Sequence, residues 1–359
     1  MTTALPASSP SPAGASALPT ATVQTVLGPV DPATLGRVMV HEHPLSLAPG
    51  PWTTGGGDVD EHAIALAASA LAPLLDHGID VVVDLSPYGV VGRADHGENI
   101  ELLAEVSRRS GVHIVAGTSV YLEAFSPAWT VDAGLDAMAE RMSADLTRGI
   151  AGTAVRAGVL GEQATGLGAI TPHEDKCLRA AARAHLRTGA AIMTHTTHGT
   201  MALEQVAILR DEGADLSRVV IGHMDIQPDI DVLAAVLEMG ACLALDTIGK
   251  QHWDFFLAPQ PTPETDGEYG KRGYFRSDLS RARILAELWR RGYGDQILLA
   301  QDLTGAEVSL NPTTHGQWGY AYLPAVFLPL AMEHGLPPEA ADTLLRSTPL
   351  RLLTLGGGS

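Results

Sequence analysis

Eight short apolar runs recur along the chain, and most are followed by a longer segment with the residue spacing of an amphipathic helix. They are residues 38–40, 81–83, 113–116, 157–160, 191–193, 219–221, 242–245 and 297–300. Each run is short enough for a strand and apolar enough to be covered on both faces, which is typical of a parallel sheet. Eight alternating units predict an α/β fold of the (β/α)₈ or TIM-barrel type, because a doubly wound sheet rarely needs so many.

The helical segments carry their own start and stop signals. They cover residues 61–77, 98–110, 172–188, 201–212, 229–239 and 279–291. The third opens with Thr171, Pro172 and Glu174, a Thr-Pro-x-Glu capping signature. Several end at a glycine just before the next apolar run, as at Gly111 and Gly189. Helix and strand signals therefore alternate in the order that a barrel requires.

The chain has 359 residues, and we predict one barrel domain over residues 21–355. Residues 1–20 are rich in Ala, Ser and Pro and contain no Lys or Arg, so we expect a disordered leader rather than a signal peptide. Residues 356–359 form a Gly/Ser tail. The connection over residues 249–275 contains several prolines and glycines, and its length is typical of either a functional lid or a disordered segment.

The charge balance restricts the partners of this protein. The chain has 23 Lys and Arg against 41 Asp and Glu, a net charge of −18, so it should repel nucleic acid and anionic membrane surfaces. No apolar run is long enough to span a bilayer. The two cysteines, Cys177 and Cys242, exclude a disulfide scaffold and predict a reducing, cytoplasmic location. A small-molecule substrate is the partner expected.

Metal-ligating side chains gather where the predicted strands end. They are His41 and His43 at the first strand, Glu162 at the fourth, His195 at the fifth, His223 at the sixth and Asp302 at the eighth. The carboxyl ends of barrel strands meet at one face, which carries the chemistry in this architecture. A single strand-end histidine is more often structural, but four with two carboxylates predict a metal centre. Zn, Mn, Fe and Co all accept this ligand set.

The constellation resembles the phosphotriesterase family of the amidohydrolase superfamily. The matching stretches are VLGPV (26–30), HEH (41–43), RAGVLGE (156–162), ITPHE (170–174), THT (194–196), LSRVVIGH (216–223), LDTIGK (245–250) and LAQD (299–302). They run through nearly the whole chain beyond the first 20 residues. The resemblance implies a TIM barrel with a binuclear metal centre, and also a homodimer.

Two departures place the chain within that family. Paraoxon-degrading members bridge their metals with a carboxylated lysine on the fourth strand, whereas here the available carboxylate is Glu162. This resembles the phosphotriesterase-homology and phosphotriesterase-related branch. Those paraoxon-degrading enzymes also carry a proton-relaying histidine after the seventh-strand aspartate, but Asp246 is followed by Thr247. Efficient organophosphate hydrolysis is therefore not expected.

By resemblance, each predicted ligand has a role. His41, His43 and Asp302 would hold the more buried of two divalent ions, most simply Zn. His195 and His223 would hold the more exposed one, and Glu162 and a hydroxide would bridge the pair. Independently of the resemblance, two divalent ions lower the pKa of a shared water toward neutrality. Asp302 is the predicted catalytic residue, because it can take the proton of this hydroxide and deliver it to the leaving group.

Further residues are candidates for substrate contacts or for support of the centre. The substrate candidates are His198, Lys250, Trp253, Tyr274 and Arg276. Cations around the long seventh connection of an acidic protein suggest an anionic substrate group, although ordinary loop solubility explains them equally well. His198 either lines the pocket or is a solvated loop residue. Asp84 and Asp225 either orient a ligand histidine or cap the next helix.

Three functions remain open from the sequence. The leading hypothesis is a metal-dependent hydrolase of a carboxylic ester, lactone or amide. The second is a phosphoesterase that uses the same centre, since loop contacts decide between the two. The third is a metal-binding protein without catalysis, which the presence of Asp302 and the complete ligand set disfavour.

Overall fold

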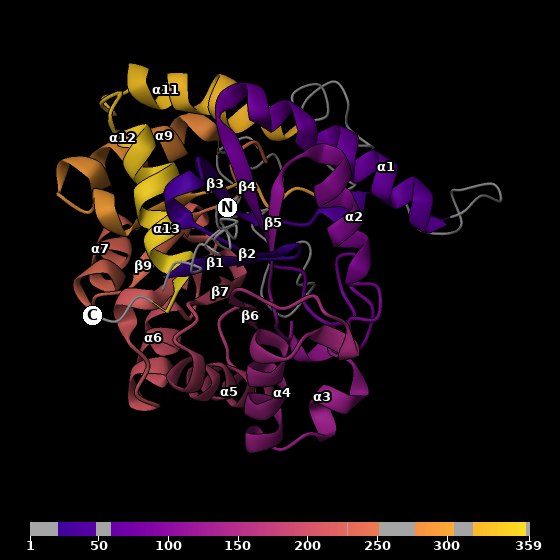
Figure 1. Ribbon diagram of the computed structural model, residues 1–359. Helices are drawn as coiled ribbons and strands as arrows, with labels where there is room; N and C mark the ends of the chain where they lie inside the picture. The colour runs from indigo at the N-terminus through magenta and orange to yellow at the C-terminus, as the bar shows by residue number, and fades with distance from the viewer. Residues whose placement is uncertain (1–20, 48–58, 228, 251–276, 305–318, 357–359) are drawn as a thin grey trace, which may run out of the picture.

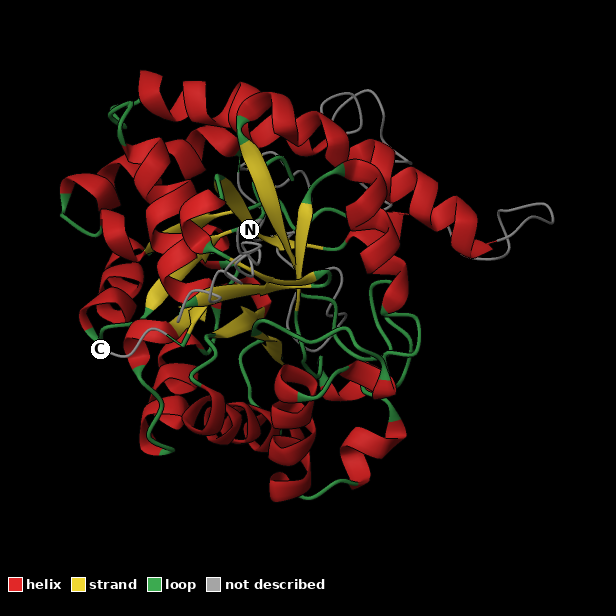
Figure 2. Cartoon of the chain, viewed as in Figure 1, coloured by secondary structure: helices red, strands yellow, loops and turns green. Residues whose placement is uncertain are grey.

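The computed structural model describes residues 21–47, 59–227, 229–250, 277–304 and 319–356. Eight parallel strands lie at the centre, and helices surround them (Figure 1, Figure 2). The strands are β3 (Arg37–Glu42), β4 (Ile79–Asp84), β5 (His113–Ala116), β6 (Leu160–Thr165), β7 (Ile192–Thr196), β8 (Val219–Ile221), β9 (Cys242–Leu245) and β10 (Ile297–Leu299). The predicted (β/α)₈ arrangement of strands and helices is confirmed.

The barrel strands form two sheets that adjoin at two seams. One sheet has the order β3-β4-β5 and the other β10-β9-β8-β7-β6. At the β5–β6 seam the N–H of Gly158 donates to the carbonyl of Ala116 at 2.8 Å. At the β3–β10 seam the N–H of Asp302 donates to the carbonyl of His41 at 3.0 Å. Predicted site residues therefore lie on one of the seams.

The helices follow the predicted order, with shifts of a few residues at some ends. They are α1 (Val59–Leu71), α2 (Glu101–Ser110), α3 (Ala128–Asp132), α4 (Leu135–Thr147), α5 (Pro172–Thr188), α6 (Ala202–Asp211), α7 (Ile230–Glu238), α9 (Asp278–Arg290), α11 (Leu328–Glu333), α12 (Ala340–Asp342) and α13 (Thr348–Leu353). In α5 the Thr171 hydroxyl accepts the N–H of Glu174, whose carboxylate accepts the N–H of Thr171. This capping box explains why the predicted start of α5 is correct.

Several elements were not predicted. Helices α3 and α4 fill the connection between β5 and β6. A small antiparallel sheet joins the two ends of the domain, with the order β11 (Thr354–Leu355), β1 (Thr22–Thr25) and β2 (Gly28–Val30). These strands are too short to show a period of two, so local sequence carries little signal for them. The predicted leader and most of the predicted tail lie outside the described residues, as does the loop over residues 251–276.

The fourth barrel strand lies further along the chain than predicted. The apolar run at 157–160 ends where β6 begins, and β6 continues through Gly161, Glu162 and Gln163 to Thr165. All six residues of β6 are buried although several are polar. The prediction was wrong because it assigned the strand to apolar residues alone, whereas β6 also contains the buried polar residues Glu162, Gln163 and Thr165. Glu162 is consequently inside a strand rather than at its end.

Apolar side chains form two layers, one inside the barrel and one between the strands and the helices. Val38 and Val40 of β3 belong to the inner layer, whereas Met39 belongs to the outer layer. The pairing register of β3 shifts between Met39 and Glu42, and that of β6 shifts between Leu160 and Gln163. Because a shift of one residue reverses the alternation of faces, these irregularities turn His41 and Glu162 into the barrel.

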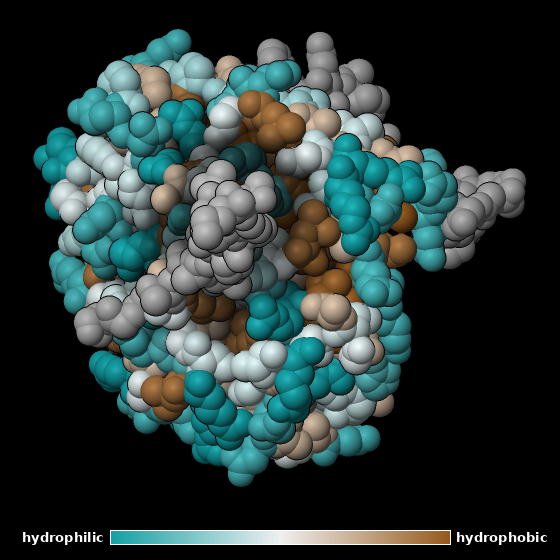
Figure 3. Space-filling model, viewed as in Figure 1, coloured by the Kyte–Doolittle hydropathy of each residue, from teal (hydrophilic) through white to brown (hydrophobic). Residues whose placement is uncertain are grey.

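Hydrophilic side chains cover much of the face shown in Figure 3, over the outer helices. This distribution agrees with the net charge of −18. Within the described residues, none of the helices has both the length and the apolar character needed to cross a membrane.

Candidate metal centre

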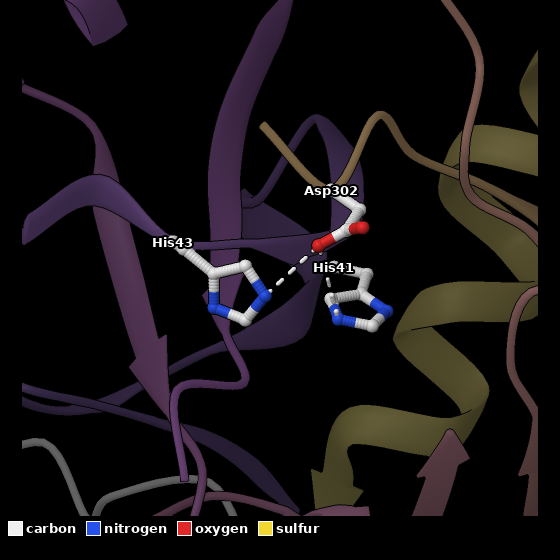
Figure 4. A group of neighbouring side chains, drawn as sticks. All are labelled: His41, His43 and Asp302. Atoms are coloured by element: carbon white, nitrogen blue, oxygen red, sulfur yellow. Dashed lines mark ion pairs between the residues drawn. The ribbon is translucent and has the colours of Figure 1, made fainter. Parts of the chain in front are cut away.

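The six predicted ligands lie together at the carboxyl ends of the barrel strands. They are His41 in β3, His43 just after it, Glu162 in β6, His195 in β7, His223 after β8 and Asp302 after β10. All are buried except Asp302, which keeps a partly exposed carboxylate. Figure 4 shows His41, His43 and Asp302 with their polar atoms directed toward one another. The fold thus brings together residues that are up to 261 positions apart in sequence.

Two groups of donors share Glu162. In the first, His43 Nε2 lies 3.0 Å and His41 Nε2 3.8 Å from Asp302 Oδ1. In the second, Glu162 Oε2 lies 3.0 Å from His195 Nδ1. Glu162 also faces the first group, since its Oε1 is 3.6 Å from His43 Nε2 and its Oε2 is 3.4 Å from His41 Nε2. A carboxylate between two such groups has the position that a bridging ligand needs.

Hydrogen bonds among the nitrogen and oxygen atoms of these six residues do not satisfy all of them, whereas divalent cations would. His41 Nε2 is buried without a hydrogen-bond partner. His223 Nε2 and His195 Nδ1 face each other at 2.8 Å, and His223 Nε2 is 3.6 Å from Glu162 Oε2. Buried polar atoms normally have partners, so an imidazole nitrogen that has none and is aimed at carboxylates fits the role of a metal ligand. Imidazole and carboxylate donors suit Zn, Mn, Fe or Co.

Asp246 supports two of the predicted ligands, and our sequence reasoning did not include it in the site. It directly follows β9 and is fully buried. Its carboxylate accepts from His41 Nδ1 at 2.7 Å, from His223 Nδ1 at 3.0 Å and from the N–H of His223 at 2.7 Å. Both imidazoles thereby present Nε2 to the centre. Asp246 directly follows a predicted strand, as several of the predicted ligands do, and this position could have identified it as a site residue.

His43 is supported from the opposite side. Its Nδ1 lies 3.0 Å from Ser86 Oγ, and Ser86 donates to Asp84 Oδ1 at 2.5 Å. Arg93 holds the other carboxylate oxygen of Asp84 at 2.9 Å. Of the two roles considered for Asp84, the structure therefore favours orientation of a ligand histidine, with Ser86 as the intermediary.

Burial and neighbouring charges lower the pKa values of Glu162 and His195 but raise that of His223. Burial alone would raise the pKa of Glu162, but His41 and the hydrogen bonds from His195 and His223 hold it well below its usual range. Burial and the neighbouring His223 lower the pKa of His195 to about 4. Burial disfavours protonation of His223, yet Asp246 raises its pKa to about 10. Clustered, oppositely perturbed groups are typical of functional sites.

Three of the six non-glycine residues with positive φ in the described part of the chain follow barrel strands at this face. His223 and Asp302 have φ angles of 57° and 51°, and His198 has 59°. Residues other than glycine rarely adopt this left-handed region, and they do so mainly where function requires a particular side-chain position. The same face of the barrel therefore carries both the donor cluster and these strained residues.

The predicted substrate contacts have different outcomes. Lys250 Nζ lies 2.5 Å from Asp302 Oδ2, so it contacts a predicted ligand. His198 is buried, which makes the solvated-loop interpretation wrong, while its role as a substrate contact stays a prediction. Trp253, Tyr274 and Arg276 lie outside the described residues.

Two further side chains border the centre. Tyr121, which we had not predicted, packs edge-on against His195 with ring centroids 4.9 Å apart. Asp225 accepts from Arg281 at 2.5 Å and from the N–H of Asp246 at 3.2 Å. Neither role expected for Asp225 is observed. Its carboxylate binds Arg281, Thr247 and the N–H of Asp246 rather than a ligand histidine, and Asp229 caps α7.

A (β/α)₈ barrel with histidines and carboxylates around one buried centre defines a class of protein, the barrel enzymes whose active sites lie at the carboxyl ends of the strands. The chain belongs to the phosphotriesterase family, whose sequence model matches residues 21–353. The predicted family is confirmed, and the protein is a hydrolase, as its family and relatives are.

Three relatives illustrate the comparison. The phosphotriesterase homology protein of Escherichia coli is 33% identical over 253 residues, 70% of this chain and 78% of that protein. Its crystal structure with phosphate in the active site has a TM-score of 0.74 at 30% identity, covering 90% of this chain and 100% of that one. The N-acetyltaurine hydrolase of Salmo salar is 28% identical, over 92% of this chain and 97% of that protein. A phosphotriesterase-like lactonase variant from Deinococcus radiodurans has a TM-score of 0.76 at 32% identity, covering 92% and 100%.

Proposed function

We propose that this hydrolase cleaves a carboxylic ester, lactone or amide bond with two divalent metal ions, most simply Zn²⁺. The observation that carries the proposal is the position of Glu162, whose two carboxylate oxygens face His41 and His43 on one side and His195 on the other. His41, His43 and Asp302 would hold one ion. His195 and His223 would hold the second, with Glu162 between the two.

The bound ions would lower the pKa of a water molecule toward neutrality and polarise the carbonyl group of the substrate. The protein itself supplies the proton transfer. Asp302 lies at the mouth of the centre, and its carboxylate is ionised, because Lys250 and the histidines outweigh the effect of burial and hold its pKa well below its usual range. Asp302 can accept a proton from the attacking water and return it to the leaving group.

Two relatives favour a carbonyl substrate. One is named an N-acetyltaurine hydrolase and another a lactonase, and both names describe hydrolysis next to a carbonyl group. An N-acyl substrate with an anionic group would also suit the ammonium group of Lys250 at the centre. A phosphoesterase is the second candidate, because the Escherichia coli relative holds phosphate in its active site.

The test is turnover of the Zn²⁺-loaded enzyme on one panel followed by NMR. The panel contains lactones, N-acyl amino acids, N-acyl aminosulfonates and aryl phosphoesters, and metal per chain is measured in parallel. We expect about two equivalents of metal and either ring opening or deacylation, and Glu162→Gln should lose about 10- to 100-fold in metal affinity. Turnover confined to phosphoesters would establish the second candidate. Absence of bound metal would overturn the proposal.

A further inference from the structure

Glu42 lies between two predicted ligands in sequence, yet it points away from them. It is fully buried at the β3–β10 seam. Its Oε1 accepts the N–H of Gln301 at 2.8 Å, and its Oε2 accepts the N–H of Leu303 at 3.0 Å. Both carboxylate oxygens are thus occupied by backbone donors from one short segment, which follows β10.

That segment carries Asp302. The two donors to Glu42 belong to the residues immediately before and after Asp302, and the N–H of Asp302 itself donates to the carbonyl of His41 at 3.0 Å. Three consecutive backbone N–H groups are therefore bound to β3. Asp302 has a left-handed backbone, with φ 51°, which is unfavourable for a residue with a Cβ unless its surroundings hold it there.

We propose that Glu42 is a positioning residue that holds the Asp302 carboxylate in place, both as a metal ligand and for proton transfer. This inference rests on the proposed metal-dependent hydrolysis. The side chain of Glu42 reaches across the seam and fixes the backbone on both sides of Asp302, so the carboxylate of Asp302 stays 3.0 Å from His43 Nε2. A ligand fixed by its backbone loses less conformational freedom when a cation binds.

The other seam shows why a carboxylate is needed at this position. At the β5–β6 seam Gln163 performs a similar bridging role with an amide. Its Oε1 accepts the N–H of Val120 at 3.3 Å, and its Nε2 donates to the carbonyl of Thr118 at 3.1 Å. That seam presents one donor and one acceptor, whereas Glu42 meets two donors. In Glu42→Gln, an amide NH₂ group would face a backbone N–H, which removes one hydrogen bond and sets two donors against each other.

The test compares Glu42→Gln with a matched variant in β4, beside the opposite end of β3. Asp80 of β4 accepts the N–H of Gly36 with its two oxygens at 2.9 and 3.0 Å. Gly36 immediately precedes β3, about 20 Å from Glu42 along the strand. Asp80→Asn makes the same carboxylate-to-amide change, but it leaves an acceptor for the single donor. Metal affinity by chelator competition with Zn²⁺, the visible spectrum of the Co²⁺-loaded protein, and kcat and KM are measured for both variants.

We expect Glu42→Gln to lose about 10- to 100-fold in affinity for one of two Zn²⁺ ions. Its kcat should fall by a similar factor while KM stays within threefold, and its Co²⁺ spectrum should change. Asp80→Asn should match the wild type in each measurement. If Glu42→Gln does not fold, Glu42→Asp is measured in its place. Its shorter side chain keeps both acceptor oxygens but reaches the two backbone N–H groups less well, so we expect an intermediate loss of Zn²⁺ affinity and kcat.

Three results would overturn the inference. They are wild-type metal affinity and kcat in Glu42→Gln, equal losses in Asp80→Asn, and a wild-type Co²⁺ spectrum in a Glu42→Gln protein whose only defect is stability. Should Glu42→Gln not fold, wild-type behaviour of Glu42→Asp would have the same meaning. A wild-type protein that binds no Zn²⁺ refutes the proposed function instead, and this outcome is recognised before any variant is made.

Discussion

The ammonium group of Lys250 lies 2.5 Å from Oδ2 of Asp302, while Oδ1 of the same carboxylate faces His43 Nε2 at 3.0 Å. Lys250 follows β9 and Asp302 follows β10, two neighbouring strands of the barrel. One carboxylate therefore has one oxygen toward the proposed metal site and the other toward a cation. Both side chains are partly exposed, so this contact lies at the solvent-facing side of the donor cluster.

Replacement of Lys250 by methionine should lower kcat with little effect on bound metal. The charge-assisted hydrogen bond to Asp302 is worth about 1.5–3 kcal/mol, so we expect a loss of about 10- to 100-fold. Lys250→Arg should retain most of the activity, because a guanidinium can still bind the carboxylate. Steady-state kinetics and metal per chain test this, and wild-type kcat in Lys250→Met would exclude the ion pair from the reaction.

Asp302→Asn should keep part of the bound metal and lose most of the turnover. The amide oxygen can still contact a cation, but the side chain can no longer accept a proton. General acid–base groups contribute about 10²- to 10⁴-fold, and we expect kcat to fall within that range. The measurement is kcat at saturating metal, with metal content determined on the same sample. Turnover close to that of the wild type would remove Asp302 from the proton-transfer role.

Asp246→Asn should weaken metal binding, because the carboxylate orients both His41 and His223. Loss of such a support typically costs about 10- to 100-fold in metal affinity. Asp229→Asn is a suitable control, since Asp229 caps α7 through the N–H of Asp231 at 2.9 Å. Chelator competition measures both variants. Equal affinities would show that the orientation of these imidazoles does not depend on Asp246.

Arg281 is a fully buried guanidinium whose loss should destabilise the fold. It binds Asp225 at 2.5 Å, Asp278 at 2.8 Å and Thr247 at 2.8 Å. In Arg281→Met two buried carboxylates lose their counter-ion, and we expect the free energy of unfolding to fall by about 3–5 kcal/mol. Urea denaturation measures this, with the exposed Arg290→Met as the control, for which no measurable change is expected. A small effect in Arg281→Met would mean that other groups neutralise the pair.

The buried thiol of Cys177 should make the folded protein less stable at alkaline pH. Its Sγ lies 3.7 Å from His173 Nε2, and burial raises the pKa of the thiol from 9.0 to about 12. The unfolded chain releases this proton near pH 9, whereas the folded chain retains it. Stability from this group is therefore complete below pH 9 and is lost as the pH rises toward 12.

Urea midpoints at pH 8 and pH 10.5 test this for the wild type and Cys177→Ala. The wild type should lose more stability between the two values than the variant does, since all other titrating groups are shared. A thiol reagent at pH 8 should also leave the native protein unmodified and react with both cysteines after denaturation, because both are buried. An equal pH dependence in both proteins would contradict the assigned pKa.

Short-range patterns in the sequence were sufficient to predict most of the strands and helices of the barrel. The capping box at Thr171 placed the start of α5 correctly, because it depends on residues three apart. Apolar runs identified seven of the barrel strands at nearly their observed positions, and the fourth was misplaced because β6 also contains buried polar residues. Strand ends also indicated which histidines would meet, since parallel barrel strands present their carboxyl ends on one face.

The supporting residues depended on contacts that no local pattern contains. Asp246 bonds to His41 from 205 positions away, and Glu42 bonds to Leu303 from 261 positions away. The register shifts in β3 and β6, which turn His41 and Glu162 inward, likewise arise only when neighbouring strands pair. These features are set by long-range hydrogen bonding.

For this protein, the sequence by itself determined the alternation of strands and helices, the family and the donor types at each strand end, because these are properties of short stretches of residues. Tertiary structure alone decided that Glu162 faces both donor groups, that Lys250 contacts Asp302 and that Glu42 holds the segment around Asp302. The physical reason is closure of the barrel, which brings distant strand ends to hydrogen-bonding distance, where most buried polar atoms have their partners.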